Sequence, residues 1–156
     1  AHHLQAQQGS DAACRHPTDL KAEDMNYIKL NGTSFDVNVA ISKYNENFNV
    51  LDGENAGRSK DTGRMIRDVL GTYIGHKITV FRRGDDYQSY DAFWNYLKAH
   101  SVDDFVLLEA ADGNTTISYR AYYTSASHDI EKVENGVNYW GEIEIHFIPI
   151  APQITP

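Results

Sequence analysis

Two Asn-Gly pairs, at 31–32 and 135–136, and an Asp-Gly-Asn triplet at 112–114 separate short runs of alternating polar and apolar residues. Asn-Gly and Asp-Gly readily adopt the positive φ angles that two-residue hairpin turns require. Alternation with a period of two indicates strands with one buried face. Runs joined by such tight turns pair antiparallel, because parallel strands need a long crossover. The sequence therefore predicts a fold built mainly from antiparallel strands.

The runs between these turns give the expected strands. A hairpin is predicted around Asn31-Gly32 in "YIKLNGTSFDVNVAIS", and residues 45–63 are loop-like, although "NFNVL" at 47–51 also allows a strand. Residues 65–83 are rich in β-branched and aromatic side chains, and their glycines at 71 and 75 suggest a bend or bulge. Further strands are predicted over 104–110, 115–125 and 137–150. Prolines at 149 and 152 are expected to end the sheet.

One segment has a different period. Tyr90, Phe93, Trp94 and Leu97 are spaced i, i+3, i+4 and i+7, which places them on one face of a helix of about 13 residues. Acidic residues at 85 and 86 precede this helix and a lysine at 98 lies near its end, matching the helix dipole. The expected architecture is thus mainly β within an α+β class. It is an antiparallel sandwich or open barrel of seven or eight strands with one flanking helix.

The chain has 156 residues, enough for one domain with a sizeable core. Its formal net charge is −8, which argues against a general nucleic-acid-binding surface. The sequence contains no apolar run long enough for a membrane span and no charged-then-apolar signal at its start. The single cysteine, Cys14, excludes an internal disulfide.

Residues 1–24 lack apolar periodicity and contain three histidines and the cysteine. We interpret them as a non-native, tag-like leader, with Met25 as the natural start. The single predicted domain is therefore 25–156. This interpretation also removes a tempting metal-ligand set at His2, His3, Cys14 and His16.

The stretch "GENAGRSKDTGRMIRD" at 53–68 has some letters of a phosphate-binding loop. Such a loop reads G-x-x-x-x-G-K-[ST] between a strand and a helix. Here Gly53 and Gly57 enclose three residues instead of four, and Arg58 stands where the lysine is needed. No helix is predicted to follow. We expect no nucleotide and no other cofactor.

The same region is dense in charge of both signs, which suits either a solvated loop or salt bridges between subunits. Seven basic residues lie between 58 and 83, interleaved with acidic residues at 52, 54, 61 and 68. The candidates for intersubunit contact are Arg58, Lys60, Arg64, Arg67 and Asp68.

"EIEIH" places Glu142, Glu144 and His146 on one face of the last strand. Side chains at i, i+2 and i+4 stand roughly 7 Å apart along a strand, too far apart to share a metal ion unaided. We therefore expect a polar outer or pore-facing surface and no metal.

Two Ser/His/Asp groups, at 100–103 and 125–129, contain the residue types of a catalytic triad. Their members are neighbours in sequence, whereas triad members converge from separate elements, so no enzyme is expected. Aromatic residues at 119, 122, 123, 139 and 140 leave a sugar-stacking platform open, although a strand splits this set between two faces.

The order of these segments resembles small tail structural proteins of long-tailed phages and prophages of Gram-positive hosts. Members begin with a strand like "YIKLNG", here at 27–32. They continue with a Gly-Arg loop, here Gly57-Arg58-Ser59 through Gly63-Arg64-Met65 to Arg67-Asp68, and end in a strand like "WGEIEIHFIPI" at 140–150. The family loop usually has Arg-Asn where this chain has Arg58-Ser59.

This resemblance implies a tail-tube-like or distal-tail-like protein that assembles as a ring around a channel, with a hexamer among the rings to be tested. It further implies other tail proteins as partners, DNA as passing cargo, and a place in the virion. Within it, Glu142, Glu144 and His146 are the candidates for the channel wall. A carbohydrate-binding β-sandwich and an unrecognised hydrolase are the alternative functions.

Overall fold

The computed structural model describes residues 27–156, so the interpretation of residues 1–24 lies outside the described part of the chain. Its elements, in chain order, are β1 (Lys29–Leu30), β2 (Asn38–Val39), the 3-10 helix η2 (Ile41–Lys43), β3 (Asn45–Asp52), β4 (Gly57–Arg58), β5 (Met65–Ile66), β6 (Val69–Phe81), α3 (Tyr87–Ala99), β7 (Val106–Asp112), β8 (Thr115–Tyr122), β9 (Ala126–Ser127), β10 (Ile130–Glu134), β11 (Val137–Trp140) and β12 (Ile143–Pro149).

Eight strands form one curled, half-barrel sheet in the order β1-β7-β8-β12-β6-β2, with β3 also paired to β6 and β9 to β12. Every pair is antiparallel. The predicted mainly β architecture with one flanking helix is confirmed. Strand β6, at 13 residues, is the spine of the sheet and pairs with three other strands.

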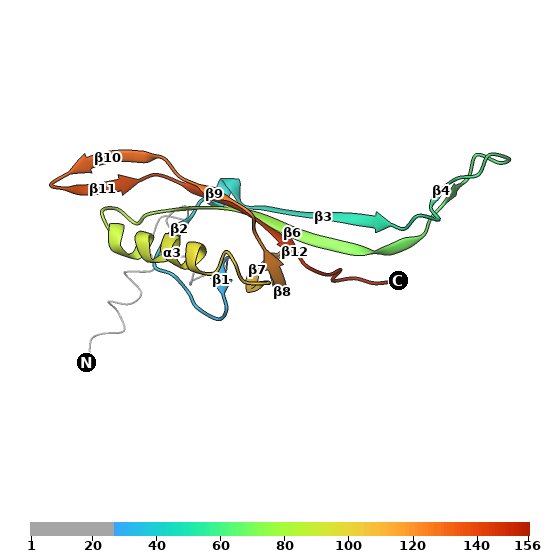
Figure 1. Cartoon of the computed structure of the whole chain (residues 1–156), viewed down its shortest axis with the longest axis horizontal. Helices are drawn as coiled ribbons and strands as arrows, with labels where there is room; N and C mark the ends of the chain where they lie inside the picture. Colours follow the sequence, from blue (N-terminus) through green and yellow to red (C-terminus); the bar gives the residue numbers. More distant parts are fainter. Residues whose placement is uncertain (1–26) are drawn as a thin grey trace.

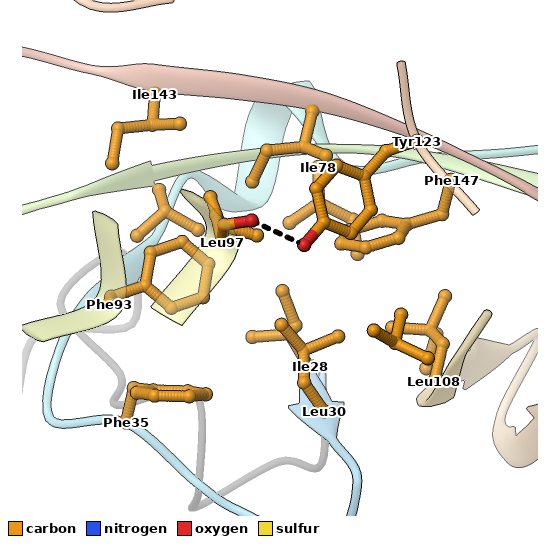
Figure 2. Close-up of a cluster of buried hydrophobic side chains, with 14 of the residues drawn as sticks. Ile28, Leu30, Phe35, Ile78, Phe93, Leu97, Leu108, Tyr123, Ile143 and Phe147 are labelled. Atoms are coloured by element: carbon orange, nitrogen blue, oxygen red, sulfur yellow. Dashed lines mark hydrogen bonds between the residues drawn. The ribbon is translucent and has the colours of Figure 1, made fainter. Parts of the chain in front are cut away.

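The core lies between the curled sheet and α3. Figure 2 shows Phe93 and Leu97 of the helix pointing at the sheet, with Phe35 beside Phe93 and with Ile78 and Ile143 above. The rings of Phe35 and Phe93 meet edge to face with centroids 4.9 Å apart. Because these side chains come from segments far apart in sequence, their burial fixes the tertiary fold and not only its local elements.

The helix begins and ends as its sequence predicts. The carboxylate of Asp86 accepts a hydrogen bond from the Ser89 backbone N–H, which satisfies one of the free donors of the first turn. Tyr90, Phe93 and Leu97 are buried along one face of α3. The hydroxyl of Tyr123 donates to the Leu97 carbonyl, tying the helix to the strand region after β8 (Figure 2).

Two hairpins project from opposite ends of the body (Figure 1). One consists of β10 and β11, joined by the predicted turn at Asn135-Gly136, where both residues have positive φ. The other consists of β3 and the first half of β6, and carries the small β4–β5 pair near its tip. The molecule is therefore elongated, with its core in the middle.

Two expectations about strands are corrected. Asn31 and Gly32 do form a tight turn, with backbone hydrogen bonds in both directions between Leu30 and Thr33. No long hairpin grows from it, because β1 pairs with β7 and β2 pairs with β6. Pro149 does not end the sheet contacts either, since Ile154 makes a further bridge to Thr72.

Candidate assembly surface

The hairpin of β3 and residues 69–77 of β6, together with its tip at 53–68, is called the arm below. Its two strands stay in register from Asn45↔Lys77 to Leu51↔Gly71, and a bulge follows before Asp52↔Val69. Figure 1 shows the arm extending away from α3 and from the β7–β8 hairpin. The region predicted to be mostly loop at 45–63 thus begins with an eight-residue strand.

The buried face of the sheet continues along the arm beyond the elements that cover it. Ile78 and Val80 of β6 are fully buried, and alternate residues of a strand share one face. Ile74 lies on that face, and its partner on β3 is Phe48. Phe48 is 68% exposed, and Val50, next along the same face, is 43% exposed. The arm therefore extends the core face of the sheet with apolar side chains, of which Phe48 and Val50 are exposed to solvent.

More apolar side chains are exposed around the tip. Some lie at the bulged end of the arm and the others on the small β4–β5 pair. The residues are Leu51, Met65, Ile66 and Leu70. Exposed apolar residues clustered on one projection are typical of a binding surface, whereas singly scattered ones are ordinary.

Three of the five predicted contact residues are held within the tip itself. The Nε of Arg67 lies 3.0 and 3.1 Å from the two carboxylate oxygens of Asp52, across the arm. The guanidinium of Arg58 donates to the Gly63 carbonyl. The Asp68 carboxylate accepts from the Asn55 N–H at 3.4 Å. These contacts shape the tip.

Lys60 and Arg64, the other two candidates, are exposed in the loop of the tip. The Arg67 pair with Asp52 makes Arg67 a poor probe of intersubunit contact, because replacing it also disturbs the arm. Arg64→Glu remains the cleaner substitution for that prediction. All five residues do lie on one projection, as expected of neighbours in sequence.

At the root of the arm, His76 is completely buried. Its Nε2 lies 2.8 Å from the Ala111 carbonyl, which can only accept, so Nε2 carries the proton. Its Nδ1 lies 2.7 Å from the Tyr119 hydroxyl, which therefore donates to it. The two bonds tie β6 to β7 and β8 and use both nitrogens of a neutral ring. Burial lowers the pKa of His76.

We expect the protein to lose stability on acidification below about pH 6.5. The unfolded chain takes up a proton at the ordinary histidine pKa, roughly 6.5, whereas His76 in the folded state does so only at lower pH. The stabilising contribution of the neutral ring is present above that value and lost as pH falls through the lowered pKa. Urea midpoints of the Glu46→Gln chain, in which the opposing titration of Glu46 is removed, measured from pH 8 to pH 5 check this. A midpoint of that chain that rises on acidification contradicts it.

Glu46 of β3 lies beside His76 of β6, and its Oε2 is 3.8 Å from His76 Nε2. Its Oε1 accepts a hydrogen bond from the Gly113 N–H at 3.2 Å. Burial, followed by a hydrogen bond to the Asp112 carboxyl group and repulsion by its charge, raises the pKa of Glu46. Two carboxyl groups and a buried imidazole thus meet where the arm leaves the body.

Glu46→Gln is expected to stabilise the protein modestly at pH 7. A folded pKa raised above the ordinary value of 4.5 means that the ionised carboxylate disfavours folding at neutral pH, while the protonated form below that value does not. The amide keeps the acceptor for Gly113 and can donate to Asp112. Thermal unfolding at pH 7 and pH 4 checks whether the gain disappears in acid. Glu54→Gln, at the exposed tip, is the control and should change neither value; equal effects in the two variants would refute the account.

The face predicted to line a channel is exposed, as alternation requires. Glu144 and His146 point away from the core, while Ile143, Ile145 and Phe147 of the same strand are buried. The Glu142 carboxylate pairs with Lys43 Nζ at 2.8 Å.

A second cation lies on this face, because His146 is the register partner of Lys77. The surface is therefore of mixed charge and not uniformly anionic.

The two Ser/His/Asp groups are engaged in structural contacts. The Ser101 hydroxyl donates to the Lys98 carbonyl, and His100 Nδ1 lies 2.6 Å from the Asp103 carboxylate. The ring of His128 is stacked between Trp94 and Trp140, at centroid distances of 3.7 and 4.1 Å. That stack fixes the segment between β9 and β10 against α3.

The aromatic set is divided between core and surface, as the strand period predicts. Tyr119 and Tyr123 are buried, and Tyr122 is 38% exposed on the opposite face of β8. Tyr139 lies on the projecting β11, under the cations of Arg82 and Lys132. These positions do not form one flat platform.

Within residues 27–156, no cluster of three or more His, Cys, Asp or Glu side chains is placed to hold a metal ion. That same part of the chain contains no helix long and apolar enough to span a membrane. Comparison with known proteins found no matching family model and no matching curated sequence.

Proposed function

We propose that this chain is a structural subunit of a phage or prophage tail, located in the tail tube or at the junction of distal tail and baseplate, and that it works by assembling into a ring. The observation that carries the proposal is the arm, whose apolar face is continuous with the core face of the sheet yet exposed. Exposing Phe48 and Val50 costs solubility unless another surface covers them.

A second copy of the chain is the partner that fits a ring. An arm at one end of an elongated subunit contacts a different surface on its neighbour, which makes the contact heterologous. Heterologous contacts repeated by a closing rotation give a ring, and those that do not close give a filament. A hexamer is one closed solution, and other tail proteins would stack on the ring.

The remaining features suit a conduit. The net charge is −8 for the chain and −6 for residues 25–156, and it disfavours tight binding of DNA, so the polymer can pass without sticking. Glu142, Glu144 and His146 are the proposed channel-facing residues, on the exposed face of β12. Lys43 offsets part of that negative charge. The proposed location is the virion tail, reached after synthesis in the host cytoplasm, and the role needs no cofactor.

Sedimentation velocity over a wide concentration range tests self-association directly. We expect a defined oligomer to grow at the expense of the monomer as concentration rises, with no continuous spread of sizes, because a closed ring has a fixed number of subunits. The same series with Arg64→Glu should shift the transition to higher concentration. A chain that remains monomeric throughout, both with and without residues 151–156, would contradict the proposal.

A further inference from the structure

One edge of the arm is closed by a segment of the chain's own backbone. Strand β12 pairs with β6 only as far as Phe147↔His76, and then leaves it to pair with β8 at Ile148↔Tyr122. The edge of β6 from 69 to 75 is thus left without β12. Residues 150–154, which we call the capping segment, return to this edge, and Figure 1 shows them running beneath the arm.

The capping segment pairs with the β6 edge as a strand would, but through only a few hydrogen bonds. The Thr72 N–H donates to the Ile154 carbonyl at 2.8 Å, and the Gln153 N–H donates to the Thr72 carbonyl at 3.0 Å. Two residues further along β6, the carboxamide of Gln153 takes the place of a peptide group. Its Oε1 accepts from the Ile74 N–H at 2.9 Å, and its Nε2 donates to the Ile74 carbonyl at 2.8 Å. A side chain therefore satisfies edge groups that a full strand would satisfy with its backbone.

The neighbouring glycine allows the segment to approach closely. A Cβ built at Gly71 would lie 2.5 Å from Pro152 Cβ and 2.9 Å from the Ile154 carbonyl oxygen. Little apolar surface holds the segment in return, because Ile150 is 43% and Ile154 56% exposed. Besides the half-buried Pro152 beside Gly71, the segment is held by five hydrogen bonds to Thr72 and Ile74 and by one from the Ile150 N–H to the Arg120 carbonyl. Each such bond has a net value of about 1 kcal/mol.

The other edge of the arm is open. β3 pairs with β6 along one side, and no strand among residues 27–156 pairs with its outer side. An unpaired strand edge is a template for another chain. The two edges are similar in length, with eight residues in β3 and seven in the capped part of β6.

We propose that the capping segment can detach from the β6 edge and protects it until then. Once it has detached, this edge pairs with β3 of a second copy. The proposal rests on the ring-forming function above and specifies how its subunits join. Rotation about a ring axis preserves the direction of each strand along that axis. Since β3 and β6 are antiparallel within a subunit, β3 of the next subunit also runs antiparallel to β6, which allows a regular ladder.

The test compares the wild-type chain with Gln153→Ala, with a chain lacking residues 151–156, and with Thr155→Ala as control, since Thr155 is exposed beside the segment. Amide hydrogen exchange of Thr72 and Ile74 in dilute protein reports how well the capping segment protects the β6 edge. Sedimentation velocity gives the concentration at which assembly begins. We expect exchange at least about tenfold faster, and assembly at a concentration at least about threefold lower, in both cap variants but not in Thr155→Ala.

Unchanged exchange in both cap variants would contradict the proposal that the capping segment protects the β6 edge. Faster exchange with an unchanged or raised assembly concentration would contradict the proposal that this edge pairs with a second copy. In either case a wild-type chain that still assembles leaves the proposed function intact. Absence of assembly in the wild type and in every variant would contradict both proposals. Assembly only after the cap is weakened would support both.

Discussion

Replacing Phe48 and Val50 together with threonine is expected to weaken self-association by at least about tenfold while leaving the fold intact. Both side chains lie on the exposed continuation of the core face along β3. Burying an aliphatic or aromatic side chain contributes about 1.5–3 kcal/mol, and about 1.4 kcal/mol is a tenfold change in affinity. Threonine preserves strand propensity, so the arm should keep its shape. Sedimentation velocity measures the association, and circular dichroism checks the fold.

Val102→Thr is the matched control for this variant. Val102 is 88% exposed, but it lies in the loop after α3 and not on the arm. The Val102→Thr substitution replaces an exposed apolar side chain by threonine, as the double variant does, but outside the proposed interface. The control should associate like the wild type. If the double variant also associates like the wild type, the arm is not the contact surface.

Phe93→Ala is expected to lower the free energy of unfolding by about 3–5 kcal/mol. Phe93 is fully buried and its ring meets Phe35 edge to face, so the substitution leaves a cavity between α3 and the sheet. Native domains are stable by only about 5–15 kcal/mol, so this single change removes a large share of the total. Urea unfolding at neutral pH gives the value.

Asn95→Ala on the exposed face of the same helix is the control. It changes a residue two positions away without opening a cavity, and alanine is the better helix former. We expect the free energy of unfolding to stay within about 0.5 kcal/mol of the wild-type value. A similar loss in both variants would mean that the effect of Phe93 is not a packing effect.

Local signals were sufficient for the helix and for the tight turns. The spacing of Tyr90, Phe93 and Leu97 predicts the buried face of α3, and the Asp86 cap lies one residue before it. The turn at Asn135-Gly136 joins β10 and β11 as predicted. In these cases the determining contacts lie within a few residues of each other.

Strand partners required information that local patterns lack. The alternating run after Gly32 indicates a hairpin, yet β1 and β2 each find a distant partner in the curled sheet. The strand at 45–52 was obscured because its exposed residues include apolar and polar side chains on both faces. Such a pattern is expected where a strand leaves the body and no longer has one buried face.

The sequence located one part of the candidate assembly surface, whose role stays a prediction. Charge density pointed to the tip at 53–68, and the structure places the tip at the end of a projection. The arm itself and its exposed face were missed, because they depend on where the β7–β8 hairpin stops covering β6. The role of Gln153 was also missed, since a glutamine after a proline carries no signal of the edge that it meets.

Electron microscopy of the protein at assembling concentrations shows directly whether the subunits form rings. We expect closed rings with an axial channel, in which the arm of each subunit lies against its neighbour. The Phe48→Thr, Val50→Thr double variant should give few or no rings under the same conditions. Fields that contain only single elongated particles at the highest attainable concentration, from the wild type and from the chain without residues 151–156, would contradict it.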